Sequence, residues 1–193
     1  ARIIELTEGK RTFDTWISTP TGVELTYYYP TGITLDDLNN SKYLPARDIS
    51  ASKQGVNYTY YEGAYKNMKD FPQAGKKVKE GTKTCFSLEG AAEDHFAYDF
   101  NALINIPEKD VYIFHLTCDD GAQLYIDGEL VVDNGEAHSA DKVASGKVAL
   151  EKGLHDIRVV YYENYMGEGL NIEIESRNMA RQSLPDNMLF VAE

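Results

Sequence analysis

The stretch from Val111 to Asp133 constrains the fold most, because its apolar residues recur at every second position. This period is that of a β-strand with one buried face. Asp127-Gly128 supplies the positive φ values that a tight hairpin turn needs. Asp119-Asp120-Gly121 interrupts the alternation, so we predict a second turn there and two β-hairpins in series. The inward members of the pattern are Tyr112, Phe114, Leu116, Leu124 and Ile126.

The same alternation recurs along most of the chain. In Val23–Tyr29, Leu154–Glu163 and Gly169–Ser176, apolar side chains face one way and polar side chains the other. Strands that recur about every ten residues, with Gly, Pro or Asp between them, are typical of a sandwich or a barrel. We therefore predict an all-β protein: an antiparallel β-sandwich preceded by a small β-rich segment.

Several local expectations follow from these patterns. Phe86–Gly90 and Phe96–Phe100 are predicted strands, whereas Lys66–Lys83, polar and rich in Lys and Gly, predicts a long surface loop. One shared core is predicted for Leu124, Ile126, Ile157, Val159, Leu170, Ile172 and Ile174.

Composition limits the partners and the cellular compartment. The net charge of -12 argues against nucleic acid and anionic membrane surfaces, which are bound chiefly through Lys and Arg. No apolar run approaches the roughly 18 residues of a membrane span, so membrane insertion is not expected. Cys85 and Cys118 are compatible with either one disulfide or two thiols. The chain starts with Ala, and we expect it to be a segment of a longer protein.

A set of short motifs identifies the family that the chain resembles. The motifs are Tyr60-Tyr61-Glu62-Gly63, Cys118-Asp119-Asp120-Gly121, Leu124-Tyr125-Ile126-Asp127-Gly128, Ser145-Gly146, Gly153-Leu154-His155-Asp156-Ile157-Arg158 and Tyr161-Tyr162-Glu163. In this order, from about Gly55 to Ser176, they resemble the protective-antigen-type domain of glycoside hydrolases, such as β-hexosaminidases, and of lectin-like adhesins. The resemblance implies a β-sandwich that acts as an accessory domain, which either binds glycan or covers the rim of a catalytic domain's site, in a secreted, periplasmic or cell-surface protein.

The resemblance also divides the chain. Residues 1–50, with Ser41, Tyr43 and a Pro-containing strand, resemble the end of the fibronectin-like modules attached to β-hexosaminidases (the chitobiase C-terminal type). We predict a β-rich segment over residues 1–52, the protective-antigen-type sandwich over 53–176 and a C-terminal strap over 177–193. The family's acidic-Gly-x-His motif is one residue longer here, as Asn134-Gly135-Glu136-Ala137-His138.

Asp119 and Asp120 are the sharpest candidates for a ligand site. Two adjacent carboxylates repel each other unless protons, donors or a cation intervene. In the lectin-like adhesins such a pair, joined by a cis peptide, holds calcium that in turn holds sugar hydroxyls, so the resemblance implies calcium as a cofactor. The alternative is that both side chains only organise a turn by bonding to the backbone.

Tyrosines are the other candidate sugar contacts. Tyr60 and Tyr61, with Tyr58, Tyr65 and Trp16, offer rings that stack on sugars, although such residues more often fill a core. Tyr58 and Tyr60 have one parity and Tyr61 the other, so at least one of the three is expected at the surface.

Neither zinc chemistry nor catalysis has a recognisable motif. His95, His115, His138 and His155 lack zinc-ligand spacing, and His155 is expected to be packed and hydrogen-bonded at a strand start. The many carboxylates give no recognisable acid and nucleophile pair of a glycosidase.

We therefore predict a non-catalytic, monomeric accessory module of a glycoside hydrolase that binds a neutral or amino sugar. The alternatives are a structural spacer that docks on a neighbouring catalytic domain and, last, a glycosidase in its own right.

Overall fold

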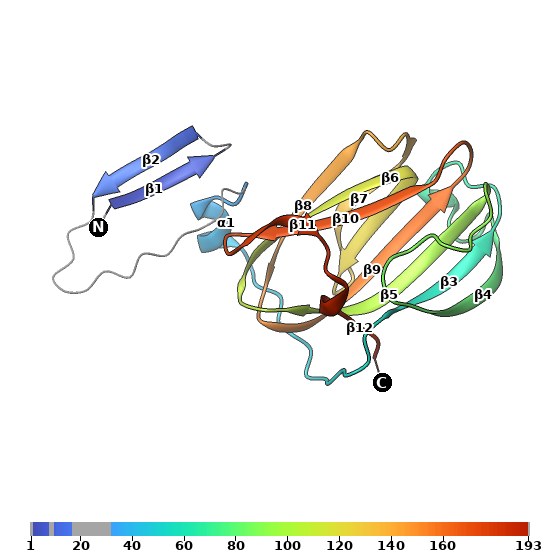
Figure 1. The fold of residues 1–193 in the computed structure, drawn as a ribbon, viewed down its shortest axis with the longest axis horizontal. Helices are drawn as coiled ribbons and strands as arrows, with labels where there is room; N and C mark the ends of the chain where they lie inside the picture. The colour runs from blue at the N-terminus through green and yellow to red at the C-terminus, as the bar shows by residue number, and fades with distance from the viewer. Residues whose placement is uncertain (1, 8–9, 17–31, 193) are drawn as a thin grey trace.

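Figure 1 shows the computed structural model of the chain, which describes residues 2–7, 10–16 and 32–192 and is built almost entirely of antiparallel strands. The strands, one α-helix and two 3-10 helices (η) follow in the order β1 (Arg2–Thr7), β2 (Lys10–Trp16), α1 (Leu35–Asn40), β3 (Val56–Glu62), η1 (Met68–Asp70), β4 (Lys76–Lys83), β5 (Phe96–Ile106), β6 (Asp110–Ile126), β7 (Glu129–His138), β8 (Val143–Leu150), β9 (Gly153–Glu163), β10 (Gly169–Ser176), β11 (Met179–Ser183), η2 (Asp186–Met188) and β12 (Leu189–Phe190).

Strand β6 belongs to both layers of a sandwich. Its first part, Asp110–Asp119, pairs with β8 and β10, and β11 extends that layer beyond β10. Its second part, Asp120–Ile126, pairs with β7 and β9, and the second layer continues through β5 and β3 to β4. The chain thus passes from one layer to the other at Asp119-Asp120. The predicted all-β antiparallel sandwich is confirmed.

The core lies between the two layers and follows the predicted parity. Each inward residue of β6, from Tyr112 to Ile126, is fully buried in one cluster with residues of the facing layer. Of the seven residues predicted to share a core, six are buried there, and Leu170 packs against the same cluster while partly exposed. The hairpin at Asp127-Gly128 is confirmed, because these residues have φ values of 48° and 83°.

The turn predicted at Asp119-Asp120-Gly121 is wrong, because β6 runs unbroken through it. Gly121 is needed for packing rather than for a turn: a Cβ there would lie 2.5 Å from Cε1 of Tyr162. Between Asp119 and Asp120 the peptide bond is cis.

Two further expectations are wrong. Lys66–Lys83 is not one long loop, because it contains η1 and the edge strand β4, whose nearly continuous exposure hides any alternation. Phe86–Gly90 is not a strand. Phe86 and Leu88 pack against the core from an irregular segment, with the ring of Phe86 edge-on to that of Phe100.

The segment before β3 covers part of the outer face of the β8–β6–β10 layer (Figure 1). Ile33 is buried there with Val111, Ile113 and Ala149, and Leu38 and Tyr43 pack against them. Backbone bonds from Leu44 to Ala149 and Glu151 tie this segment to β8. The proposed division between residues 52 and 53 stays a prediction.

Other expectations concern residues outside the described part. The predicted strand Val23–Tyr29 lies outside the described residues, and so does the side chain of Trp16.

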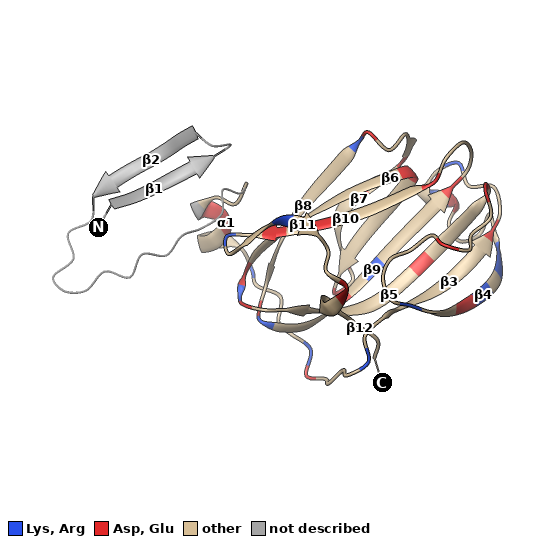
Figure 2. Ribbon diagram, viewed as in Figure 1, with Lys and Arg blue, Asp and Glu red and all other residues tan. Residues whose placement is uncertain are grey.

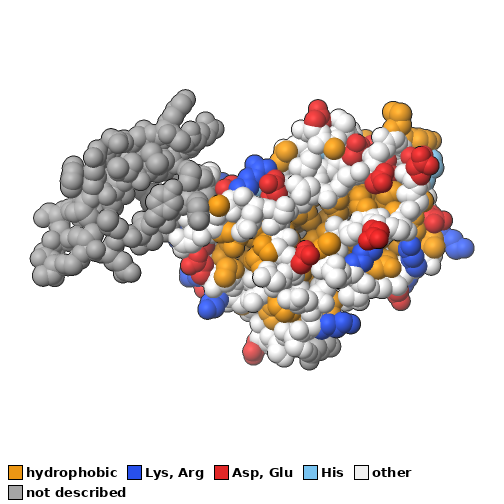
Figure 3. All heavy atoms as spheres, in the orientation of Figure 1, with side chains coloured by type: hydrophobic (Ala, Val, Ile, Leu, Met, Phe, Trp, Pro, Cys, Tyr) orange, Lys and Arg blue, Asp and Glu red, His pale blue; other side chains and the backbone are white. Residues whose placement is uncertain are grey.

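Both cysteines are free thiols, with Cys118 buried and Cys85 partly exposed. In the described ranges, no helix is long and apolar enough to cross a membrane. Acidic and basic side chains are interspersed on the face shown in Figure 3.

Candidate functional site

Asp119 and Asp120 lie where β6 crosses between the layers, at one end of the sandwich. In the strand register Asp119 faces Gly169 of β10, whereas Asp120 faces His138 of β7. Both side chains are partly buried. Figure 2 shows acidic positions, in red, on several strands of the sandwich, and a third carboxylate lies beside this pair.

That third carboxylate is Glu163, the last residue of β9. One oxygen from each of Asp119, Asp120 and Glu163 lies within 4.8 Å of the others. Glu163 is fully buried, and its Oε1 atom has no hydrogen-bond partner. The sequence analysis missed Glu163 as a site residue, although its parity with Tyr161 on β9 already placed it on the inward face.

The electrostatics of this acidic cluster (Asp119, Asp120 and Glu163) are unfavourable for three charged carboxylates. Burial, followed by repulsion from Asp120, raises the pKa of Glu163 to about 8. Burial and the neighbouring Asp120 also raise the pKa of Asp119. A positive charge among these oxygens offsets both the burial and the repulsion.

Hydrogen bonds hold the cluster in place. The hydroxyl of Tyr161 lies within bonding distance of the Asp119 carbonyl oxygen and, at 3.1 Å, of Oε2 of Glu163. The backbone N–H of Asn164 donates to Oδ2 of Asp120 at 2.8 Å. The Asp119 carboxylate also accepts a backbone hydrogen bond from Ala140, whereas Oε1 of Glu163 has no such partner.

The donor set fits calcium. Carboxylate and carbonyl oxygens are the hard ligands that Ca²⁺ prefers, and it takes six to eight of them. An unpartnered oxygen on a buried carboxylate costs free energy unless a proton or a cation satisfies it. Asp119, Asp120 and Glu163 would supply three carboxylates, and water or ligand hydroxyls would supply the rest.

Tyr165 forms an exposed rim next to the cluster. It follows Asn164 in the loop after β9, and its side chain is 59% exposed. Its ring lies edge-on to that of His95, with centroids 4.5 Å apart. The backbone N–H of Met166 donates to Asp94, which ties the loops after β4 and β9 together. Sequence reasoning missed Tyr165, because a loop residue has no strand parity.

The predicted tyrosines do not join this site. Tyr60 is a core residue, only 2% exposed, and its hydroxyl accepts the backbone N–H of Ala92, so the expectation that it stacks on a sugar is wrong. Tyr65 is fully buried. Tyr61 is partly exposed on the opposite face of β3, as its parity predicted, and lines a separate groove.

The histidines have mainly structural contacts. His155 is fully buried, with Nδ1 2.7 Å from Oδ2 of Asp127 and Nε2 2.9 Å from the Glu151 carbonyl oxygen, which agrees with its expected role. On the outer face of the β8–β6–β10 layer, His115 lies between Ser145 and Glu175, at 2.7 and 2.9 Å. The three residues lie on β8, β6 and β10, which pair with one another in that layer.

Comparison with known proteins gives a family match. The family model described as "PA14 domain" matches residues 52–175. Anti-sigma-I factor RsgI3 of Acetivibrio thermocellus is 23% identical over 106 residues, which is 54% of this chain and 16% of that protein. The chain therefore spans only a small part of this curated relative.

Solved structures share the fold. An anti-sigma factor domain-containing protein has a TM-score of 0.61 at 21% identity, over 72% of this chain and 48% of that one. The PA14 sugar-binding domain from an RTX adhesin has a TM-score of 0.57 at 16% identity, and the match covers 73% of this chain and 100% of that one. The subtype-switched Epithelial Adhesin 9 A domain of Candida glabrata, in complex with beta-lactose, has a TM-score of 0.59 at 12% identity. That match covers 79% of this chain and 96% of the adhesin domain.

Proposed function

The chain belongs to the PA14 domain family, and from that membership we propose that it is a non-catalytic carbohydrate-binding module in which Asp119 and Asp120 bind calcium. The observation that carries this proposal is the convergence of Asp119, Asp120 and Glu163, with one buried and unpartnered oxygen among them. Calcium bound there would present open coordination positions to sugar hydroxyls.

The surroundings of the acidic cluster support a sugar ligand. Tyr165 is exposed next to it, with its backbone N–H donating to Oδ2 of Asp120 at 3.4 Å, and an aromatic face packs against the C–H groups of a sugar ring. Structural neighbours point the same way, since one is described as sugar-binding and another was solved with beta-lactose. We propose a neutral or amino sugar as the ligand, and a monomeric module.

The likeness to anti-sigma factors favours one context for this module. Both the relative and the solved structure are longer than the chain, which covers 16% and 48% of them. We propose that the module senses a glycan outside the cell, in a secreted, periplasmic or cell-surface position. Attachment to a glycoside hydrolase is the second context, and a spacer that docks on a catalytic domain is the alternative without a ligand.

The metal proposal is tested by thermal unfolding in excess calcium and in chelator. Calcium at a hundred times its Kd adds about 2.7 kcal/mol, which for a domain of this size raises the Tm by roughly 5 to 11 °C. The double variant Asp119→Asn with Asp120→Asn is expected to lose this rise. Asp48→Asn with Asp186→Asn, at two exposed aspartates elsewhere, is the matched control and should keep it.

A parent Tm that is the same in calcium and in chelator contradicts the metal proposal. A glycan array probed in both solutions then tests the sugar. Binding that needs calcium and is lost in the Asp double variant supports a calcium-dependent site, whereas the spacer alternative predicts no glycan binding in either solution.

A further inference from the structure

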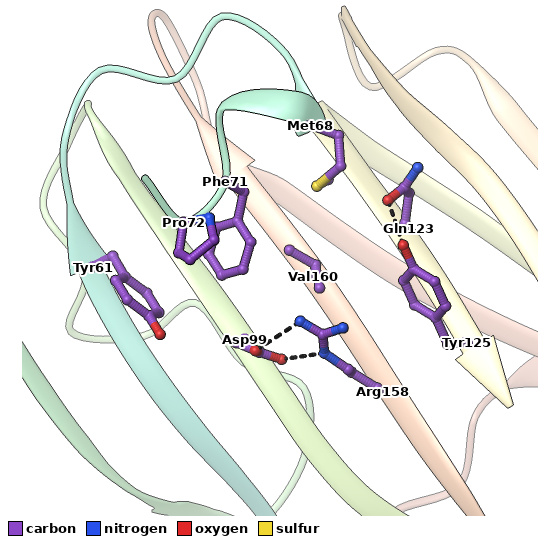
Figure 4. A pocket seen from close by; sticks show the side chains of 9 residues that line it. All are labelled: Tyr61, Met68, Phe71, Pro72, Asp99, Gln123, Tyr125, Arg158 and Val160. Atoms are coloured by element: carbon purple, nitrogen blue, oxygen red, sulfur yellow. Dashed lines mark hydrogen bonds and ion pairs between the residues drawn. The ribbon is translucent and has the colours of Figure 1, made fainter. Parts of the chain in front are cut away.

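A groove runs along the outer face of the second layer, away from the acidic cluster. It consists of two cavities of about 240 and 290 Å³ that share Tyr125 of β6 and Arg158 of β9. Figure 4 shows the first cavity, with Met68, Phe71 and Pro72 on one side and Arg158 between Asp99 and Tyr125. We propose that this groove is a second, calcium-independent binding site for an uncharged oligosaccharide.

The sheet places the groove apart from the acidic cluster. On β9, Arg158 and Val160 point outward, whereas Ile157 and Val159 point into the core. Arg158 precedes Glu163 by five residues, so at about 3.3 Å per residue the two side chains start roughly 16 Å apart along the strand. Substitutions in the groove therefore leave the carboxylates of the cluster in place.

The polar floor of the groove is fixed before any ligand arrives. Arg158 donates to both carboxylate oxygens of Asp99, at 2.8 and 2.9 Å, and its guanidinium lies 5.6 Å from the ring centroid of Tyr125. The hydroxyl of Tyr125 donates to Oε1 of Gln123 at 2.7 Å, and Nε2 of Gln123 donates to Asp133 at 3.0 Å. Fixed side chains lose little conformational entropy when a ligand binds.

Aromatic rings supply the stacking surfaces. Tyr61 and Tyr125 are both partly exposed, on opposite sides of the first cavity in Figure 4. Phe71 lies edge-on to Tyr61, with ring centroids 5.2 Å apart, and supports that wall. Partly exposed rings beside hydrogen-bonding side chains match the two faces of a sugar ring, one apolar and one hydroxylated.

The charges of the lining favour an uncharged ligand. Asp99 is neutralised by Arg158, and Asp156 in the second cavity pairs with Arg47. No excess charge remains in the lining to attract a phosphate or a polycation. The ligand would meet the face of the sheet rather than an edge, so a peptide could not add as a strand. An extended oligosaccharide with hydroxyl groups fits both conditions.

The length of the groove indicates more than one sugar unit. Each cavity alone is smaller than the roughly 300 to 1,000 Å³ of a usual small-molecule site, and the two adjoin at Tyr125 and Arg158. A ligand in contact with both would therefore pass over these two residues. Truncation of Tyr125 would therefore remove contacts in both cavities.

The test is affinity electrophoresis of the full chain in gels containing uncharged polysaccharides (glucan, xylan, mannan and galactan), all in chelator. We expect at least one polysaccharide to retard the parent and the Asp119→Asn, Asp120→Asn double variant alike. Tyr125→Ala and Tyr61→Ala should weaken this retardation on the order of 10-fold, because each removes a stacking face. Val143→Ala, at an exposed side chain on β8 in the other layer, is the control and should be retarded like the parent.

Thermal melts of each variant in chelator confirm that the tested proteins are folded. The inference is overturned if no polysaccharide retards the parent, if folded Tyr61→Ala and Tyr125→Ala variants are retarded like the parent, or if a peptide library binds the groove while the polysaccharides do not. Because calcium is absent and the double variant is included, these outcomes are independent of the calcium proposal.

Discussion

Glu163 is a buried carboxylate, and residues of its own strand and of β6 form its surroundings. It lies at the end of β9 on the same face as Tyr161, so the regular parity of the strand points it inward against Asp119 and Asp120. A buried acid beside two others favours the protonated form, and its pKa of about 8 is well above the 4.5 of an unperturbed Glu. Protonation and stability are therefore linked in the metal-free chain.

In chelator, the free energy of unfolding contributed by Glu163 is expected to fall as pH rises. Its folded pKa lies above its unfolded value, so the folded state binds more protons between about pH 4.5 and 8. This stability is fully present below pH 4.5 and is lost as pH passes 8. Glu163→Gln should flatten the decline, as measured by urea unfolding at pH 5, 6, 7 and 8.

The exposed Glu129→Gln is the control for this measurement and should follow the parent at every pH. If Glu163→Gln also follows the parent, Glu163 is charged in the folded chain and the link between its burial and its pKa is absent.

Part of the site could be predicted from single residues. Asp119 and Asp120 were found because adjacent acids before a Gly form a recognisable motif. Glu163 was missed because charge suggests an exposed position, whereas parity put it inside. Tyr60 was misplaced because a ring that can stack on a sugar is equally able to fill a core.

Among the elements, β9 contributes to both faces of its layer. Ile157 is 1% exposed and lies opposite Ala102 on β5 and Ile126 on β6. Its outward neighbour Arg158 belongs to the groove. The strand therefore carries core packing on one side and candidate ligand contacts on the other.

Ile157→Ala is expected to lower the free energy of unfolding by about 2 to 5 kcal/mol, because it removes buried methyl and methylene groups and leaves a cavity. Urea unfolding measures the change. Leu130→Ala is the control, since Leu130 is 47% exposed and such a change normally stays within about 0.5 kcal/mol. Equal effects of the two substitutions would contradict the assigned register of β9.

The sequence predicted the strands that bury one face against the core, and it missed the strand that buries neither face. The strands β9 and β10 were expected at Leu154–Glu163 and Gly169–Ser176, because their alternation is regular. Strand β4 was missed because it pairs only with β3 and exposes nearly every side chain, three of them Lys. Charged edge strands of this kind resist pairing with other chains, but they carry no period-two signal.

The sequence pattern predicted a turn within β6, the longest of the described strands, which in fact continues through that point. A pair of acids before a Gly is typical of a turn, and the local residues offer no sign that β6 continues. The evidence for continuation is non-local: Tyr162 on β9 occupies the space beside Gly121. A contact between residues 41 positions apart is not visible in a local pattern.

At the scale of the whole molecule, the sandwich packs against a segment outside the matched family region. Residues 33–47 cover Val111 and Ile113 and add bridges at Leu44 and Arg47. The family model begins at residue 52. The packing thus extends beyond the region that the family model matches.

A chain that starts at residue 51 is therefore expected to unfold more easily than one that starts at residue 32. Loss of the cover exposes Val111 and Ile113, and burial of such a side chain is worth about 1.5 to 3 kcal/mol. We expect a difference of about 3 to 6 kcal/mol by urea unfolding. Equal stabilities would support the predicted boundary between residues 52 and 53, and would show that the preceding segment rests on the sandwich without stabilising it.

The crossing of β6 between the layers has a mechanical consequence. A glycan anchored through calcium at Asp119 and Asp120 would pull on backbone that is bonded to β8 and β10 on one side and to β7 and β9 on the other. Tension at this point loads both hydrogen-bonded layers together instead of peeling a hairpin open one bond at a time.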